Sequence, residues 1–332
     1  MSVTIKDIAQ KMNISISAVS KAINDKEDVS NELKKKVKEV AEEMGYSPNY
    51  FAKKLVMNKS YQIGVFILGL NKLSTSEHFG FNFIEGIMEE AEKHFYDVIL
   101  FSGNETKSFK KICKEKKIEG AIFIGLKFDN ESISDIKNID IPISIIDLKV
   151  NGKNISYISS DNKEGVLTGL EYLYSLGHRD IAIINGEKNS QISDIRYNAY
   201  LQFIKSHNIY NENYIAYGDF TRESGYKAMN QLLNKKIVPT AVFVTSDLMA
   251  IGAIQAIHDK KIRVPQDISV IGFDNIKASE YIYPKLTTIG QDAIEIGRKS
   301  VENIILKINN KKNYEKILIK PQLIIRDSCM KI

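Results

Sequence analysis

The chain has few cysteines and no long apolar run, and each absence excludes a class of protein. Cys113 and Cys329 are its only cysteines, they lie far apart, and neither belongs to a metal-ligand motif. Two isolated thiols are typical of a reducing compartment and exclude a disulfide scaffold. No stretch approaches the roughly twenty apolar residues that a membrane span needs. The first ten residues also lack the apolar core of a secretory signal. We therefore expect a cytoplasmic protein without a metal site.

Short motifs of common enzyme chemistry are also missing. The chain contains no G-x-G-x-x-G, no G-x-x-x-x-G-K-[ST], no H-E-x-x-H and no G-x-S-x-G. Dinucleotide binding, nucleotide phosphate binding, zinc proteolysis and serine hydrolysis therefore leave no signature here. We expect a protein that is not an enzyme, with no catalytic residue and no cofactor.

The composition predicts more than one packed core. The chain has 332 residues, of which 43% are apolar and 26% charged, and a net charge of +5. A chain of this length and composition is globular and exceeds the size of one ordinary domain. The first sixty residues hold eleven lysines against eight acidic residues, so most of the positive charge lies there. Such a bias is compatible with phosphate binding, although a charge cluster of this size is usually just a solvated surface.

The first 45 residues predict three short helices. Thr4 and Asp7 have the spacing of a capping box, Ser15 and Ser30 can cap two further helices, and Gly45 can end the last one. Apolar residues recur at helical spacing in each segment, namely Ile5, Ile8, Ala9 and Met12, then Val19, Ala22 and Ile23, then Leu33, Val37, Val40, Ala41 and Met44. Two short helices joined by a tight turn favour a helix-turn-helix, but three amphipathic helices also occur in modules that never contact DNA.

In a helix-turn-helix, residues that face outward near the start of the second helix meet base edges in the major groove. Here these residues are Ile16, Ser17 and Lys21. Ile16 can contact a thymine methyl, Ser17 can exchange hydrogen bonds with a base edge, and Lys21 can donate to guanine or to phosphate.

The segments TIKDIA, AVSKAIN, GYSPN and AKKL follow one another in an order and spacing that resemble the headpiece of the LacI/GalR (lactose-repressor) family. The resemblance implies a headpiece over residues 1–47 and a hinge over residues 48–60. Lys21 stands where many members have arginine. The residues that the resemblance and the helix pattern assign to DNA are Thr4, Ser15, Ile16, Ser17, Ser20, Lys21, Asn24, Ser30, Asn49, Ala52, Lys53 and Leu55.

The segment after Pro48 is too short to form a stable helix alone. It carries Ala52 and Leu55 at helical spacing beside Lys53 and Lys54, so it can fold on DNA. In the family this hinge pairs with its dimer mate in the minor groove, where a leucine matching Leu55 wedges between base pairs. The alternative is a basic linker with one exposed leucine.

From Tyr61 onward, short apolar runs alternate with amphipathic stretches. The runs are YQIGVFIL, DVILF, GAIFI, PISII, DIAII, TAVFVT and ISVIGF. This alternation predicts an α/β fold with parallel sheets. The family resemblance continues through residues 61–332 and implies a two-lobed, periplasmic-binding-protein-like core for effector binding and dimerisation. One lobe then spans about 61–160 and 291–320, and the other spans about 161–290 and 321–332.

A sugar effector needs bidentate polar partners and a flat apolar wall at strand ends. Residues of these types follow the predicted strands or line the pocket in sugar- and purine-binding members by resemblance. They are Phe79, Asp147, Arg196, Phe220, Ser246, Asp274 and Gln291. Ser246 stands where many members have asparagine, and Phe79 also fits a core position. We interpret Asp161 as a helix cap and His178 as a packing residue at a helix-to-strand turn.

These features predict a DNA-binding transcription regulator, a repressor by the family's usual output, that is controlled by a sugar or sugar derivative. Its partners are then double-stranded DNA with a near-palindromic operator and a second copy of the chain, with no membrane partner. After Arg326 there is no leucine heptad, which favours a homodimer over a tetramer. One alternative is a global regulator of the catabolite-control type, whose corepressor is a phosphorylated carrier protein. A transport-type sugar-binding protein would need an export signal and no DNA-binding head.

Overall fold

The computed structural model describes residues 3–23, 26, 28–46, 59–68, 80–102, 108–125, 128–311 and 314–332, and of residues 80 and 81 only the backbone. The chain divides into two compact units, Met1–Ser60 and Tyr61–Ile332. Within the described ranges, none of the helices combines the length and the apolar character that crossing a membrane requires.

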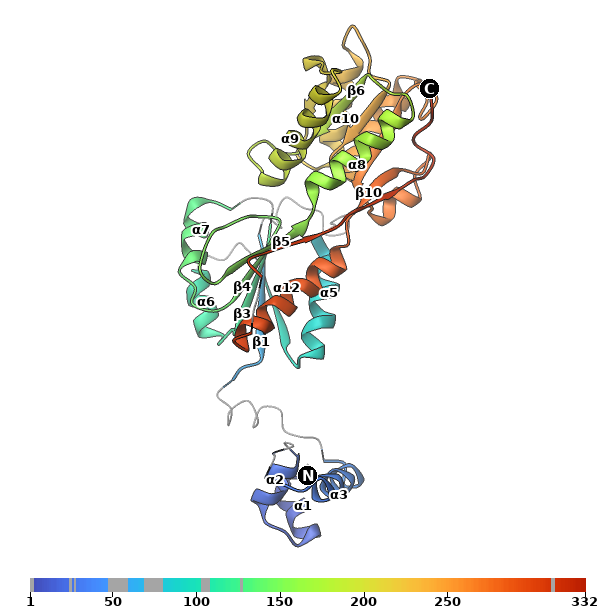
Figure 1. Ribbon diagram of the computed structural model, residues 1–332. Helices are drawn as coiled ribbons and strands as arrows, with labels where there is room; N and C mark the ends of the chain where they lie inside the picture. The colour runs from blue at the N-terminus through green and yellow to red at the C-terminus, as the bar shows by residue number, and fades with distance from the viewer. Residues whose placement is uncertain are drawn as a thin grey trace. The chain divides into compact units, whose positions relative to one another are not determined.

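In the described part of the first unit, the chain forms the three predicted helices, α1 (Ile5–Met12), α2 (Ile16–Ile23) and α3 (Asn31–Glu43) (Figure 1). The predicted caps are confirmed. Ser15 accepts a hydrogen bond from the amide of Ala18 at 3.1 Å, Ser30 accepts one from Leu33 at 3.3 Å, and Gly45 has a φ of +66°. The helices enclose one apolar core whose buried members are Ile8, Ala9, Val19, Ala22, Val37 and Ala41.

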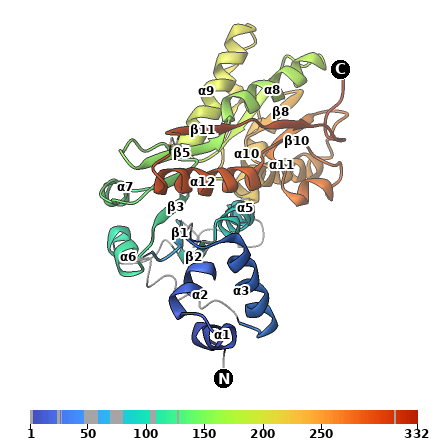
Figure 2. The same ribbon diagram turned by 60° about the horizontal axis from the view of Figure 1, so that its bottom comes forward.

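The second unit contains two six-stranded sheets. In sheet A, every neighbouring pair of strands is parallel, in the order β11-β5-β4-β3-β1-β2. Its strands are β1 (Gln62–Ile67), β2 (Asp97–Ser102), β3 (Gly120–Ile124), β4 (Ile143–Ile146), β5 (Ile155–Ser160) and β11 (Lys316–Ile319). Figure 2 shows β11 beside β5, at the edge of the sheet.

Helices cover both faces of sheet A (Figure 1). One face packs against α5 (Gly80–Lys93) and α12 (Ala293–Ile308), and the other packs against α6 (Phe109–Glu115) and α7 (Asn130–Lys137). Because helices cover both faces, the side chains on both faces of the central strands are buried. Successive residues of a strand point to opposite faces, so these strands are continuous apolar runs.

Sheet B has the order β12-β10-β9-β8-β6-β7. Its strands are β6 (Ile181–Asn185), β7 (Ile215–Tyr217), β8 (Ala241–Val244), β9 (Ser269–Asp274), β10 (Thr287–Gly290) and β12 (Gln322–Ile324). One face packs against α8 (Asn162–Ser175) and α9 (Gln191–Ser206), and the other against α10 (Arg222–Leu233) and α11 (Asp247–Asp259). Two short 3₁₀ helices, η2 (Glu212–Tyr214) and η3 (Lys277–Glu280), precede β7 and β10.

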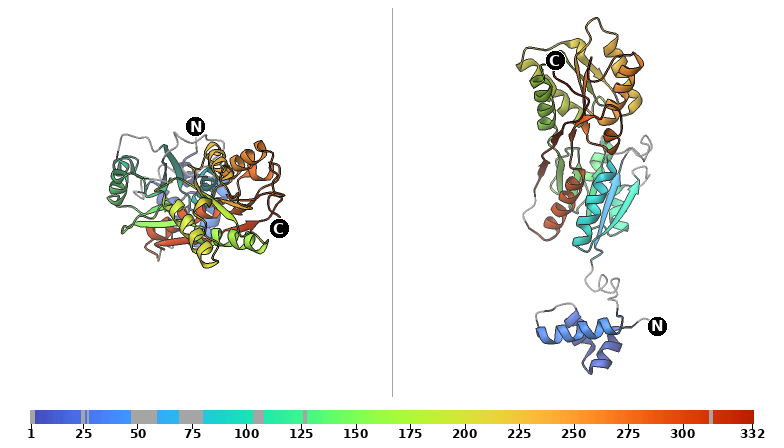
Figure 3. Two further views of the ribbon diagram at one scale, coloured as in Figure 1. Left: turned by 90° about the horizontal axis from the view of Figure 1, so that it is seen from above. Right: turned by 90° about the vertical axis from the view of Figure 1, so that its right-hand side faces the viewer.

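The chain passes from one sheet to the other at three places, between β5 and α8, between β10 and α12, and between β11 and β12. The last passage brings β12 into sheet B antiparallel to β10, whereas the other neighbouring strands of this sheet are parallel, as predicted. The chain then ends beside α8, where the amide of Ile332 donates to the carbonyl oxygen of Leu176 at 2.9 Å (Figure 3).

Candidate functional sites

Helix α2 presents the predicted DNA-reading side chains to solvent. Val19 and Ala22 are fully buried, which turns Ile16, Ser17 and Lys21 outward. Ile16 is 52% exposed, a high value for a large apolar side chain in so small a unit. The interpretation of these three residues as outward-facing is therefore confirmed, while their contact with DNA stays a prediction.

Other residues predicted to bind DNA lie at helix ends. Ser15 and Ser30 cap α2 and α3, and Thr4 donates its amide and its hydroxyl to Asp7 Oδ2 at 2.8 and 2.7 Å. All three are exposed, and Ser20 is half-buried. The remaining residues predicted to contact DNA are Asn24, Asn49, Ala52, Lys53 and Leu55. They lie outside the described residues, as does most of the predicted hinge at 48–60. Sequence reasoning missed an ion pair on this surface, from Lys21 Nζ to Asp28 Oδ2 at 2.5 Å.

In the second unit, the buried guanidinium of Arg196 is the centre of a polar cluster. Arg196 lies in the second turn of α9. It is 4% exposed and donates from Nε to Asn162 Oδ1 at 2.8 Å and from Nη1 to the carbonyl oxygen of Thr245 at 2.5 Å. Its guanidinium carbon lies 3.8 Å from the ring centre of Phe273. Burial lowers the pKa of Arg196, and the fields of Asp274 and Asp147 oppose this effect.

Asp147 follows β4 in a left-handed backbone conformation, with φ of 64°. Ser159, near the end of the neighbouring strand β5, donates its hydroxyl to Asp147 Oδ1 at 2.5 Å. Burial raises the pKa of Asp147, while the Ser159 hydrogen bond and Arg196 lower it. The predicted residues Asp147 and Arg196 thus interact electrostatically, although one follows sheet A and the other packs on sheet B.

Asp274 and Gln291 complete the cluster at the ends of β9 and β10. Gln291 Nε2 donates to Asp274 Oδ1 at 2.7 Å. Burial raises the pKa of Asp274 to about 7, with Arg196 opposing the rise and Asp247 adding to it. Sequence reasoning left Asp247 out of the site. This carboxylate accepts from Thr288 Oγ1 at 2.5 Å, and burial raises its pKa to about 6.

The raised pKa of Asp274 predicts a defined pH dependence of stability. In the unfolded chain the carboxyl has its ordinary pKa of 3.8, so between that value and about 7 the folded protein binds the extra proton. Stability should therefore rise as the pH falls from about 8 to about 5, relative to Asp274→Asn, in which this contribution is absent. Urea unfolding of both proteins across this range measures the difference, in which groups that do not interact with Asp274, such as His178, cancel. Parallel profiles would contradict the assignment.

Two predicted effector residues have other partners. Ser246 is buried and caps α11, accepting a hydrogen bond from the amide of Met249 at 3.2 Å. Phe220 has a φ of 68°, and its ring packs so closely on Gly186 that a β-carbon there would overlap it. Both positions border the carboxyl ends of β6, β7 and β8. Phe79 lies outside the described residues.

The carboxyl edge of sheet B also gathers unpartnered polar atoms. Among the described side chains, five buried polar atoms lack a hydrogen-bond partner, and all five follow a strand of this sheet or begin α9: Asn185 Oδ1, Ser190 Oγ, Ser193 Oγ, Thr245 Oγ1 and Gln291 Oε1. Buried polar atoms are rarely left unsatisfied, and such a group at one edge indicates a place for a polar ligand. Only Gln291 of these was predicted. The signal was present, since each of the others is a polar residue at a strand end or a helix start.

Two structural interpretations from the sequence are confirmed. Asp161 caps α8 by accepting from the amide of Glu164 at 3.1 Å. His178 is buried, with Nδ1 3.0 Å from Thr240 Oγ1 and Nε2 3.0 Å from Ser269 Oγ. It joins the end of α8 to sheet B and takes no part in the cluster around Arg196.

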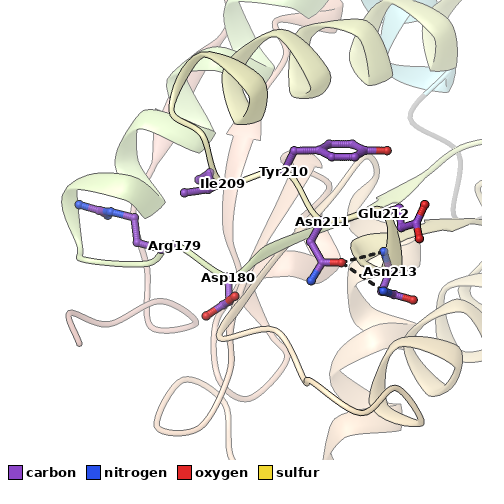
Figure 4. Close-up of a pocket in the computed structure, with 7 residues that line it drawn as sticks. All are labelled: Arg179, Asp180, Ile209, Tyr210, Asn211, Glu212 and Asn213. Atoms are coloured by element: carbon purple, nitrogen blue, oxygen red, sulfur yellow. Dashed lines mark hydrogen bonds between the residues drawn. The ribbon is translucent and has the colours of Figure 1, made fainter.

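A surface pocket of about 490 Å³ lies at the opposite edge of sheet B. Arg179 and Asp180 precede β6, and residues 209–213 precede β7, so this pocket is at the amino ends of the strands. In Figure 4 the Asn211 side chain accepts hydrogen bonds from Asn213, at 3.0 Å from the backbone amide and 3.3 Å from the side-chain amide. The pocket contains none of the predicted effector residues.

Comparison with known proteins agrees with both units. Residues 4–49 match the lacI family of bacterial regulatory proteins, and residues 170–329 match the periplasmic binding protein-like domain. The chain is 36% identical over 333 residues to a probable HTH-type transcriptional repressor, ExuR, of Bacillus subtilis (strain 168), covering 99% of each chain. It is 31% identical to the HTH-type transcriptional repressor PurR of Pasteurella multocida (strain Pm70), covering 98% of each.

Among solved structures, the chain resembles the lac repressor dimer bound to operator and the anti-inducer ONPF. The TM-score is 0.79 at 26% identity, over 99% of this chain and 100% of that one. The helix-turn-helix unit and the paired parallel sheets define a two-part DNA-binding regulator, and the chain belongs to the lacI family of bacterial regulatory proteins. It is a transcriptional regulator, as its full-length relatives are.

Proposed function

We propose that the protein is a repressor that binds a near-palindromic operator as a homodimer. Each protomer would place α2 in the major groove of one half-site, with Ile16, Ser17 and Lys21 toward the base edges. Residues 48–60 would form the hinge that orders on DNA between the half-sites. The exposure of these three side chains over a buried core supports this placement. The lac repressor neighbour, which was solved as a dimer on its operator, supports the dimer.

Exposed aromatic residues on the second unit also favour a dimer. Tyr281 is 75% exposed and Tyr283 is 89% exposed, on the segment that follows η3. Large aromatic side chains that are exposed together are typical of protein interfaces. A second copy of the chain is the partner that a palindromic operator requires, because its symmetry must match that of the protein.

We infer further that a small polyhydroxylated molecule, a sugar or sugar derivative, controls the repressor in the cytoplasm. The observation that carries this proposal is the cluster at the carboxyl edge of sheet B. There the buried Arg196 interacts electrostatically with the partly buried Asp274 and with Asp147 from the end of sheet A, next to unpartnered polar atoms. Charged groups in such a setting recognise hydroxyls by paired hydrogen bonds. The ring of Phe220 at the same edge could supply the apolar wall.

The three passages between the sheets connect this cluster to the rest of the second unit. Gln291, which holds Asp274, immediately precedes α12 at one passage, and Asp161 caps α8 at another. A ligand that binds both sheets favours one relative arrangement of the two lobes. The ligand therefore shifts the population of dimers that can bind DNA. The size of the shift is set by the difference between its affinities for the two arrangements.

A titration of the full-length protein tests the effector class. We expect one member of a panel of monosaccharides, disaccharides and sugar acids to raise the melting temperature and to change the affinity for an operator selected from randomised duplexes. Asp274→Asn should lose both responses, whereas Asp267→Asn, at an exposed ion pair with Arg263, should keep them. If no sugar acts and a phosphorylated carrier protein changes operator binding instead, the effector proposal is wrong.

A further inference from the structure

The ion pair between Lys21 and Asp28 lies on the surface proposed to face DNA. Lys21 is in the last turn of α2, and Asp28 is in the segment that leads to α3. Lys21 Nζ is 2.5 Å from Asp28 Oδ2, and the two side chains are 49% and 55% exposed. The amide of Lys26 donates to the carbonyl oxygen of Lys21 at 3.0 Å, so Lys26, like Asp28, lies beside the end of α2.

Neither stability nor phosphate binding explains the carboxylate at this position. An ion pair so exposed contributes little to folding, because water screens it and both side chains lose freedom. A carboxylate also repels phosphate, which is the dominant source of affinity for DNA. The hydrogen bond from Lys21 lowers the pKa of Asp28, so the group stays ionised and remains a hydrogen-bond acceptor.

A donor beside an acceptor matches the major-groove edge of one base pair. Guanine presents two adjacent acceptors, N7 and O6, and its partner cytosine presents the N4 amino donor. O6 and N4 are hydrogen-bonded to each other, so they lie about 2.9 Å apart. That separation is close to the 2.5 Å between Lys21 Nζ and Asp28 Oδ2.

We propose that Asp28 is a specificity-determining residue, and that Lys21 and Asp28 together read one G·C base pair in each half-site. Lys21 donates to N7 and O6 of guanine, and Asp28 accepts from N4 of cytosine. This inference rests on the proposed placement of α2 in the major groove. An A·T pair also places an acceptor, N7, beside a donor, N6, but it offers the lysine one acceptor where guanine offers two, so it fits less well.

Base-preference profiles of the full-length protein test the proposal. Wild-type protein and variants would each be selected against a library of randomised duplexes and sequenced. We expect one position in each half-site to prefer G·C in the wild type, and Asp28→Asn to reduce that preference about tenfold. Asn donates as well as accepts, so it tolerates other pairs. Glu32→Gln removes the matched exposed ion pair with Lys36 on α3 and should leave the profile unchanged.

An exchanged pair separates base reading from a structural role. Lys21→Asp combined with Asp28→Lys keeps an ion pair between the two positions, and thermal unfolding would verify that the variant folds. If the pair only holds the loop and neither side chain reads a base, the exchanged variant recovers the wild-type profile. If Lys21 reads guanine alone, Asp28→Asn keeps the full G·C preference. Either result shows that the proposal is wrong. If the pair reads bases, the G·C preference of the exchanged variant is lost or reversed. Failure of the wild type to enrich any sequence would instead overturn the proposed DNA-binding function.

Discussion

Replacing Arg196 by Met is expected to lower the free energy of unfolding by about 3 kcal/mol, at the lower end of the range for removing one member of a group of interacting buried charges. The variant leaves Asn162 Oδ1 and the carbonyl oxygen of Thr245 without their donor. It also removes the cation that lowers the pKa of Asp274, so this carboxyl takes up a proton instead of remaining an isolated buried charge. That neutralisation limits the loss.

Two measurements test this expectation. Urea unfolding at neutral pH gives the stability, and a pH series should show the contribution of Asp274 titrating above about 7 in the variant. Arg179→Met is the matched control. Arg179 is exposed, stacks 3.5 Å from the Tyr174 ring centre and donates to backbone carbonyls, so its loss should cost less than about 1 kcal/mol. Equal losses in both variants would show that the cluster has no special energetic role.

The sequence predicted those parts of the fold whose apolar pattern is strong. All seven apolar runs became strands. Six of them are inner strands, whose two faces are covered by helices and therefore need continuous apolar sequence, and the seventh, β2, is an edge strand. The strands that it missed include β7, β11 and β12, which are short edge strands with partly exposed residues. It also missed β5, whose sequence ISYISS is fully buried although half of it is serine. There, hydrogen bonds made by the serines replace the apolar signal.

Of the residues in the candidate sites, the sequence predicted those with a local signal and missed those that only the tertiary structure brings together. Asp147, Asp274 and Gln291 were predicted because a polar residue directly after an apolar run is visible in sequence. Asn162 and Thr245 were missed because their role is to hold Arg196, and only the tertiary structure brings them to it. The pair of Lys21 with Asp28 depends on the path of the turn between two helices, which helical periodicity does not determine.

Gly86→Ala should produce a second large effect, through the contact between α5 and α12. A β-carbon at Gly86 would overlap the carbonyl oxygen of Ile294, and one at Gly297 would overlap that of Phe83. Alanine normally stabilises a helix interior by about 1 kcal/mol relative to glycine. Here the β-carbon meets backbone that cannot rotate away, so the two helices must separate, at a cost of about 3 kcal/mol. The steric cost is the larger, and we expect a net destabilisation of about 2 kcal/mol.

The same contact connects stability with the proposed effector response. Helix α5 begins directly after Phe79 and α12 begins two residues after Gln291, so the glycine crossing fixes two helices that each follow a predicted effector residue. The other sheet has an equivalent contact, because a β-carbon at Gly225 on α10 would overlap Met249 and one at Gly252 on α11 would overlap Arg222. We therefore expect Gly225→Ala to destabilise the protein as Gly86→Ala does. Glu85→Ala, on the exposed side of α5, should be neutral. Urea unfolding measures the free energy of unfolding of these variants. If Gly86→Ala unfolds with the same free energy as the wild type, α5 and α12 can separate without cost and the prediction is wrong. The effector response of the variant should in that case be unchanged.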